Sequence, residues 1–320
     1  MFEGLVKPGD LVVGADSHTC TYGALGAFSA GIGATDMACA WAVGELWFRV
    51  PETIRVEVNG EFAPFVGAKD LILHIVGSLG VDGAIYQAIE FAGSTIHNLS
   101  MDGRFTICNM AIEAGAKTGL IEPDTITRKF VEDVEVRKGK RGEPRDYATL
   151  KSDPDAAFSH RLKVDAAKLR PMVAAPYLPS NVMTAEDAKE TKVDQVMIGS
   201  CTNGRLEDFR LAASVMGKHK VHPDVRLLIV PATQEIYMGL IQEGLAEQFV
   251  AAGAMVTPPT CGPCMGGHMG VLGPKETGLF TTNRNSHGRN GHMDSRVYLA
   301  GPAVAAASAL TGRITDPNLL

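Results

Sequence analysis

The last third of the chain alternates short apolar segments with longer segments of helical spacing. The apolar segments 192–200, 225–232 and 254–259 predict buried strands, and the segments 205–217 and 233–253 predict helices. Strands that alternate with helices indicate right-handed βαβ units around a parallel sheet. The sequence therefore predicts an α/β fold built from three-layer α/β/α domains with mainly parallel sheets.

The pattern before residue 172 is more varied. Leu11–Gly14 predicts a strand, and the Ala- and Gly-rich stretch Ala34–Trp47 predicts a helix. Residues 53–62 (TIRVEVNGEF) alternate apolar and polar positions around Asn-Gly, which favours a hairpin. Residues 68–80 (AKDLILHIVGSLG) have helical spacing and end on glycine. The charged stretch 132–171 is typical of a solvated linker.

These segments predict three domains, with boundaries near residues 50 and 171. They are 1–50, 51–171 and 172–320. A buried strand that starts within ten residues of Met1 needs neighbouring strands, so 1–50 is expected to be the remainder of a larger domain.

Composition narrows the class of protein. The chain is 45% hydrophobic and 21% charged, with a net charge of −6, which does not favour a dedicated nucleic-acid surface. No apolar run is long enough to span a membrane, and the first residues lack the pattern of a secretory signal. We therefore expect a cytoplasmic protein, in which the six cysteines are thiols or metal ligands.

Three cysteines lie where two predicted strands end. Cys201 follows the strand at 192–200, and Cys261 and Cys264 follow the strand at 254–259. Ligand sites of parallel sheets lie at the carboxyl ends of the strands, so the two loops are expected to meet at one edge.

The residues themselves leave three interpretations of these cysteines open. Zinc would need a fourth ligand, for which His268 is available. An iron–sulfur cluster held by three thiolates would leave one iron open to substrate. Simple burial as small apolar side chains is the third, and it is the interpretation preferred for Cys39 and Cys108, while Cys20 stays ambiguous. Gly266 and Gly267 favour an open loop over a thioredoxin-type helix after Cys264.

Five motifs in order resemble the aconitase-type hydro-lyases, and within them the large subunits of the isopropylmalate dehydratase and homoaconitase branch. The resemblance runs over nearly the whole chain. The motifs are GADSHT (14–19), ICNMAIEAGA (107–116), GSCTNGRLED (199–208), CGPCMGGHMG (261–270) and TTNRNSHGRNG (281–291).

The resemblance implies a [4Fe-4S] cluster and a set of site residues. It implies that Cys201, Cys261 and Cys264 ligate the cluster, with Asn109 and Asn283 beside it. It further implies that Asp16, Ser17, His18 and Glu113 are catalytic and that Arg284 and Arg289 bind substrate carboxylates. Arginine suits that role because its planar fork binds a carboxylate through two hydrogen bonds. Taken alone, these arginines would be a basic surface loop, His18 a turn residue and Glu113 part of a solvated helix face.

Two departures from the family pattern bear on activity. The family carries a sizeable portion before the first motif, with a catalytic Asp-His pair, whereas few residues precede it here, so the chain is expected to be N-terminally shortened. Ser286, His287 and Asn290 are polar where relatives more often carry other residues. These departures leave open a truncated cluster-binding protein without catalysis.

The resemblance also implies a partner. Enzymes of this branch place the swivelling domain on a separate small subunit, which carries the serine base and the loop that selects the substrate side chain. We expect this chain to need such a subunit. The expected reaction is the isomerisation of a 2-hydroxy acid by dehydration and rehydration, with 3-isopropylmalate first and homocitrate, 2-methylmalate or dimethylmalate as alternatives.

Overall fold

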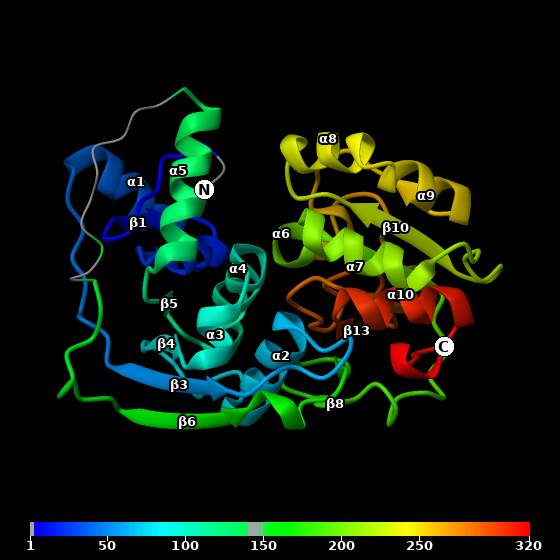
Figure 1. Cartoon of the computed structure of the whole chain (residues 1–320), viewed down its shortest axis with the longest axis horizontal. Helices are drawn as coiled ribbons and strands as arrows, with labels where there is room; N and C mark the ends of the chain where they lie inside the picture. Colours follow the sequence, from blue (N-terminus) through cyan, green and yellow to red (C-terminus); the bar gives the residue numbers. More distant parts are fainter. Residues whose placement is uncertain (1–2, 140–146, 148–149) are drawn as a thin grey trace. The chain divides into compact units, whose positions relative to one another are not determined.

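A computed structural model describes residues 3–139, 147 and 150–320 of the chain (Figure 1). It divides into two compact units. Unit 1 comprises residues 1–61 and 82–167, and unit 2 comprises residues 62–81 and 168–320. The division into three domains at residues 50 and 171 stays a prediction.

Unit 1 contains two parallel sheets. The larger has the strand order β5-β4-β3-β6, and every neighbouring pair is parallel. The smaller pairs β1 with β2 in parallel. The bounds are β1 (Leu11–Gly14), β2 (Phe28–Gly31), β3 (Thr53–Asn59), β4 (Ala88–Ala92), β5 (Thr118–Ile121) and β6 (His160–Asp165).

The hairpin predicted at 53–62 is wrong. β3 lies between β4 and β6 and pairs with both in parallel. Its alternation is real, because Ile54, Val56 and Val58 are buried on one face while the residues between them are less so. The period of two reports which face is covered but not the direction of the neighbouring strand. Gly60, at a φ of 97°, ends the strand instead of opening a hairpin turn.

The linker predicted at 132–171 is wrong at both of its ends. Helix α5 (Thr125–Arg137) enters it, and β6 completes the edge of the four-stranded sheet. The alternation of charged and apolar residues in β6 fits an exposed edge strand, whose burial is largely confined to Val164. Residues 140–146 and 148–149 of the predicted linker lie outside the described residues.

The helices of unit 1 place the two unassigned cysteines differently. Cys108 is fully buried in α4, as predicted, but Cys39 is exposed in α1, so its predicted burial is wrong. None of the residues of α1 is buried in the described part of the chain, because its apolar side chains lack a covering layer there. The helices are η1 (Ser17–Leu25), α1 (Ala34–Val43), α3 (Ser94–Asn98), α4 (Met101–Asn109), η2 (Met110–Ala114) and α5.

An ion pair between a buried arginine and a partly buried aspartate fixes α4 to the start of α5. The fully buried guanidinium of Arg104 donates from Nη1 and Nη2 to the two carboxylate oxygens of Asp124, at 2.8 and 2.6 Å, and Nη2 also donates to His97 O. The same carboxylate caps α5 by accepting from the backbone N–H groups of Ile126 and Thr127. Partial burial acts to raise the pKa of Asp124, but Arg104 and the cap outweigh it and hold that pKa below its usual range.

We expect Arg104→Met to lower the free energy of unfolding by about 3 kcal/mol, because it leaves the Asp124 carboxylate without its buried partner. Urea unfolding followed by circular dichroism measures the change. Since the pKa of Asp124 is lowered by folding, the wild-type advantage should be present at neutral pH and fade as the pH falls through that lowered pKa. The control is Lys129→Met, which removes an exposed pair with Asp133. Equal midpoints for Arg104→Met and this control would contradict the prediction.

Unit 2 is built around one seven-stranded sheet with the order β11-β10-β9-β12-β13-β7-β8. The five strands from β11 to β13 are parallel, as predicted from the alternation of the last third, and β7 and β8 join in antiparallel. The bounds are β7 (Met172–Ala174), β8 (Val182–Thr184), β9 (Gln195–Gly199), β10 (Arg226–Val230), β11 (Met255–Val256), β12 (Thr277–Phe280) and β13 (Arg296–Ala300). The α/β class with mainly parallel sheets is confirmed.

Helices cover this sheet, and α7 and α10 pack on each other and on β9 (Figure 1). Helix α2 belongs to this unit although unit 1 flanks it in sequence. The helices are α2 (Ala68–Leu79), α6 (Ser200–Asn203), α7 (Leu206–Met216), α8 (Gln234–Gln242), α9 (Leu245–Ala252), η4 (Gly262–Met265), α10 (Pro302–Thr311) and η5 (Pro317–Leu319). None of the helices in the described ranges is long and apolar enough to cross a bilayer.

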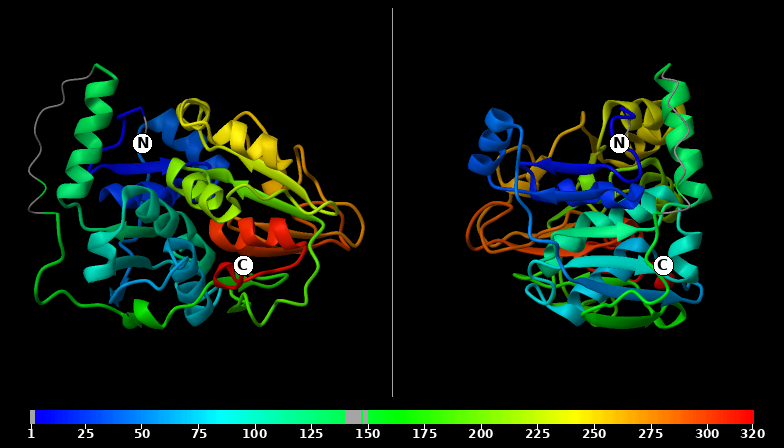
Figure 2. Two further views of the ribbon diagram at one scale, coloured as in Figure 1. Left: turned by 45° about the vertical axis from the view of Figure 1, so that its right-hand side comes forward. Right: turned by 90° about the vertical axis from the view of Figure 1, so that its left-hand side faces the viewer.

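The single helix predicted at 233–253 is two helices. Gly244, at a φ of 73°, separates α8 from α9, and the two yellow helices point in different directions in Figure 2. Helical spacing continues on both sides of the break, so the periodicity alone did not reveal it. A residue with a left-handed backbone conformation cannot continue an α-helix, and only glycine adopts that conformation at little cost.

Candidate functional site

The turn that presents Cys201 depends on a glycine. Gly199 ends β9 with a φ of 145°, and a Cβ there would lie 1.9 Å from Val230 O on the neighbouring strand. The chain can therefore leave the sheet sharply and place Cys201 in the short helix α6. Arg205 holds this turn from behind, because its Nη2 donates to Cys201 O at 2.9 Å and its Nη1 to Thr202 O at 2.7 Å.

The second cysteine loop is a single 3-10 turn rather than the fully open loop predicted. Cys261 is its N-cap, and the N–H of Cys264 donates to Cys261 O at 3.2 Å. Gly266, at a φ of 70°, ends the turn, which explains why the glycines suggested an open loop. The buried Asn290 fixes it, since its Nδ2 donates to the carbonyls of Pro263 and Cys264 at 3.1 and 3.3 Å. Asn290 thus has a structural role at this position.

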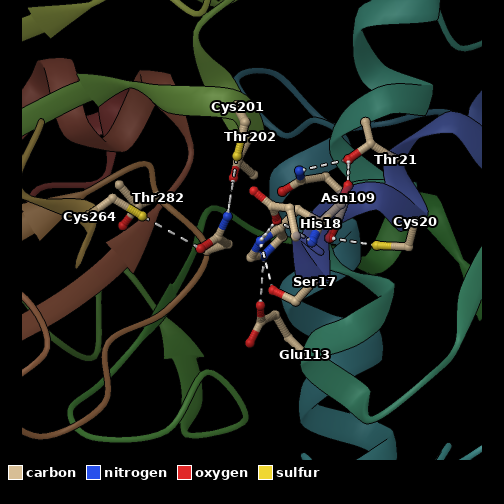
Figure 3. Close-up of polar contacts among 12 residues, drawn as sticks. Ser17, His18, Cys20, Thr21, Asn109, Glu113, Cys201, Thr202, Cys264 and Thr282 are labelled. Atoms are coloured by element: carbon tan, nitrogen blue, oxygen red, sulfur yellow. Dashed lines mark hydrogen bonds and ion pairs between the residues drawn. The ribbon is translucent and has the colours of Figure 1, made fainter. Parts of the chain in front are cut away.

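The two cysteine loops meet at one amide. Asn283 follows β12, and its Nδ2 lies 3.6 Å from Cys201 Sγ. Its Oδ1 lies 3.8 Å from Cys264 Sγ. Figure 3 shows Cys201, Thr202 and Cys264 in this arrangement. Burial raises the pKa of Cys264 to about 11, and the thiol of Cys201 adds to this, while the guanidinium of Arg289 acts in the opposite direction.

The described side chains at this edge do not form a compact site for one metal ion. Among the described residues, no three Cys, His, Asp or Glu side chains are gathered as one metal ion requires. His268, the fourth ligand that zinc would need, has its Nδ1 3.0 Å from Thr260 Oγ1. The thiols of Cys201 and Cys264 lie on the two sides of the Asn283 amide, so side chains of both cysteine loops reach the same place at this edge.

A second set of predicted residues meets in unit 1. Asp16 caps η1 by accepting from His18 N at 2.7 Å, which fixes the backbone of the Asp-Ser-His sequence. His18 Nε2 lies 3.0 Å from Glu113 Oε1, and its Nδ1 lies 3.3 Å from Ser17 Oγ (Figure 3). A carboxylate can only accept, so Nε2 carries the hydrogen and Nδ1 can accept the Ser17 hydroxyl proton. Ser17, His18 and Glu113 therefore form one polar chain.

Asn109 is linked to His18 through the hydroxyl of Thr21. Its fully buried side chain donates from Nδ2 to Thr21 Oγ1 at 2.9 Å, and that hydroxyl donates to His18 O at 2.6 Å. Cys20, left ambiguous by its sequence context, is fully buried and donates from Sγ to Asn109 O. Cys20 therefore packs and bonds beneath the histidine, and the place of Asn109 beside a cluster stays a prediction.

The predicted substrate arginines lie on the loop after β12. Arg284 and Arg289 are half-buried, and Arg289 lies against Cys264. Of the three polar residues noted on the same loop, Asn290 is buried and the other two are exposed. Ser286 and His287 are exposed, and the ring of His287 packs edge-on against Tyr177 at 4.6 Å. These two exposed side chains place hydrogen-bonding groups on the same loop as the two arginines.

One residue of this region was missed in the sequence. Lys69 is fully buried on α2, and its Nζ donates to Asn203, Thr281 and Thr282, close to Cys201 and Asn283. The signal was the Lys-Asp pair at the start of an otherwise apolar helix, since charges at apolar helix positions need specific partners.

Comparison with known proteins places this arrangement in a family. The model of the aconitase family (aconitate hydratase) matches residues 1–192 and 183–312. The chain therefore belongs to the aconitase family.

The relatives specify the branch. The chain is 58% identical over 315 residues to the 3-isopropylmalate dehydratase large subunit of Moorella thermoacetica, covering 98% of this chain and 73% of the relative. It is 56% identical to the proteins of the same name from Thermodesulfovibrio yellowstonii and Heliobacterium modesticaldum, covering 99% of this chain and 74% and 73% of theirs. The chain thus spans about three quarters of the length of these relatives.

A solved structure supports the fold. Thermococcus kodakaraensis aconitase X in its holo form matches with a TM-score of 0.52 and 15% identity. The match covers 88% of this chain and 64% of that one. At this identity it confirms an aconitase-like α/β fold and nothing further.

Proposed function

We propose that this chain is the large subunit of a hydro-lyase that isomerises 3-isopropylmalate by dehydration and rehydration, the step expected of leucine biosynthesis. The observation that carries the proposal is the Asn283 amide between the sulfurs of Cys201 and Cys264. The large subunits from Moorella thermoacetica and Thermodesulfovibrio yellowstonii, which are more than half identical to this chain over nearly its whole length, support the same reaction.

Cys201, Cys261 and Cys264 would hold a [4Fe-4S] cluster, which supplies a Lewis acid for the leaving hydroxyl when bound. Asn283 can orient the Cys201 thiolate by donating to it from Nδ2, whereas its Oδ1 accepts from Cys264 only while that cysteine is a protonated thiol. Asn290 and Arg205 keep the loop backbones in place by binding their carbonyls. These contacts fix the backbone of the two loops that carry the three cysteines.

The remaining residues handle protons and charge. His18 can accept a proton at Nδ1 from Ser17 while Glu113 holds its Nε2–H, which keeps one tautomer in place. Asp16 fixes the backbone of that histidine. Arg284 and Arg289 would bind the two carboxylates of the substrate, since each guanidinium matches a carboxylate with two N–H groups.

The name "large subunit" of the relatives supports a small-subunit partner. We propose that this partner completes the substrate site and selects the substrate side chain. The large subunit alone would bind carboxylates without distinguishing the isopropyl group from other substituents.

The test is reconstitution of the chain with iron and sulfide without oxygen, followed by mixing with a small subunit of an isopropylmalate dehydratase. We expect about four iron and four sulfide per chain and dehydration of 3-isopropylmalate, followed at the absorbance of the unsaturated product. Homocitrate, 2-methylmalate and dimethylmalate form the substrate panel. Preference for one of these would replace the proposed substrate, and a bound cluster without turnover of any of them would support a non-catalytic cluster-binding protein.

A further inference from the structure

Lys69 is a buried lysine for which the proposed chemistry has no role. Its side chain is almost completely removed from solvent at the start of α2. A buried ammonium must satisfy three N–H groups, and this one finds three oxygens in unit 2: Asn203 Oδ1 at 3.3 Å, Thr281 O at 2.8 Å and Thr282 O at 2.6 Å.

These three acceptors belong to the two segments that carry the candidate cluster contacts. Asn203 ends α6, two residues after Cys201, and Thr282 precedes Asn283. Asn203 Nδ2 also donates to Asp208 Oδ1 at 2.9 Å, which ties the same amide to the start of α7. The ammonium therefore joins the end of β12 to the turn after β9, where Asn283 and Cys201 meet.

The neighbouring Asp70 fixes the helix that presents the lysine. Its buried carboxylate accepts from Gly67 N at 2.9 Å and from Met172 N at 2.7 Å, so the first turn of α2 is tied to β7. Burial raises the pKa of Asp70 to about 6, against the effect of these two N–H groups. Lys69 thus extends from a helix start that cannot shift freely.

A positive charge on Lys69 would also stabilise negatively charged thiolates nearby. Burial lowers the pKa of Lys69 to about 7, while Asp208, Asp70, Cys201 and Cys264 act to raise it. Thiolates carrying full negative charge would favour the ammonium further. The contribution is therefore both geometric and electrostatic.

We propose that Lys69 is a positioning residue of the cluster site, which holds the Cys201 turn and the Asn283 strand end in register and places a positive charge behind the thiolates. This inference rests on the proposed cluster function. Residues of this kind, which orient metal ligands without touching the metal, commonly change metal affinity by about 10- to 100-fold when replaced.

The test compares wild type, Lys69→Met and the matched control Lys189→Met, an exposed lysine of the same unit. After anaerobic reconstitution, we expect Lys69→Met to lose its cluster to a chelator about 10- to 100-fold faster than wild type. We also expect the reduction potential of its cluster to be lower, because reduction adds negative charge that the missing ammonium no longer offsets. A loss of global stability that leaves the surroundings of the bound cluster unchanged would not move that potential.

If Lys69→Met fails to fold by circular dichroism, Asn203→Ala takes its place, because it removes one acceptor and leaves the lysine itself in the chain. It is expected to speed cluster loss by several-fold relative to the exposed control Asn318→Ala. Loss rates and potentials equal to wild type in a folded variant would overturn the role of Lys69 alone. A wild-type chain that binds no cluster would overturn the proposed function and this inference with it.

Discussion

A Cys201→Ala chain is expected to retain its fold and to hold almost no [4Fe-4S] cluster after reconstitution. The physical reason is that a cluster held by three protein thiolates already has one iron without a protein ligand. Loss of one thiolate leaves two irons without a protein ligand, so the cluster is weakly held. The side chain itself is exposed in the structure and contributes little to packing. Iron and sulfide content and the visible absorption of the protein measure the result, with circular dichroism to confirm folding.

Cys39→Ala is the matched control, since Cys39 is also exposed but lies on α1 in unit 1. It should bind as much iron and sulfide as the wild type. Undiminished cluster content in Cys201→Ala would rule out Cys201 as a ligand. Loss in both variants would point to damage unrelated to ligation.

Replacement of His18 by alanine is expected to reduce turnover by roughly 10²- to 10⁴-fold while the cluster stays bound. The substitution removes the ring between Ser17 Oγ and Glu113 Oε1, and with it the proton acceptor at Nδ1. Steady-state dehydration of 3-isopropylmalate by the chain mixed with a small subunit provides the measurement. The loss should fall on kcat, because proton transfer belongs to the chemical step.

His160→Ala is the control for this change, because His160 is an exposed residue of β6 in the same unit. Its turnover should equal that of the wild type. Glu113→Gln should lie between His18→Ala and wild type, since the amide keeps an oxygen that can accept from Nε2 but no longer carries charge. A His18→Ala enzyme with unchanged kcat would remove the histidine from the proposed chemistry.

Much of the parallel architecture could be predicted from local patterns. The strand 192–200 ends in Gly-Ser-Cys, and the structure ends β9 at Gly199 and turns there, because that glycine allows a backbone approach that a side chain would block. The expectation that the Cys201 and Cys264 loops meet at one sheet edge follows from strand direction alone, and the contacts of Asn283 agree with it.

The errors and omissions concern partners distant in sequence. The alternation of β3 is the same for a hairpin and for a strand with two parallel neighbours, and only β6, about a hundred residues later, decides between them. Lys69 was missed for the same reason, because its acceptors Asn203 and Thr282 lie 134 and 213 residues further along the chain. Exposure of Cys39 depends on what covers α1, which its own composition does not determine.

The discontinuity of unit 2 has a consequence for how the protein is made. Residues 62–81 leave the ribosome long before residues 168–320, which complete the same unit. At a synthesis rate of about 5–20 residues per second, roughly 10 to 40 s pass between the appearance of Lys69 and that of Thr282. During this interval the nascent chain carries an apolar helix whose charged start has yet to meet its acceptors, and unit 2 can close only after residues 168–320 have been made.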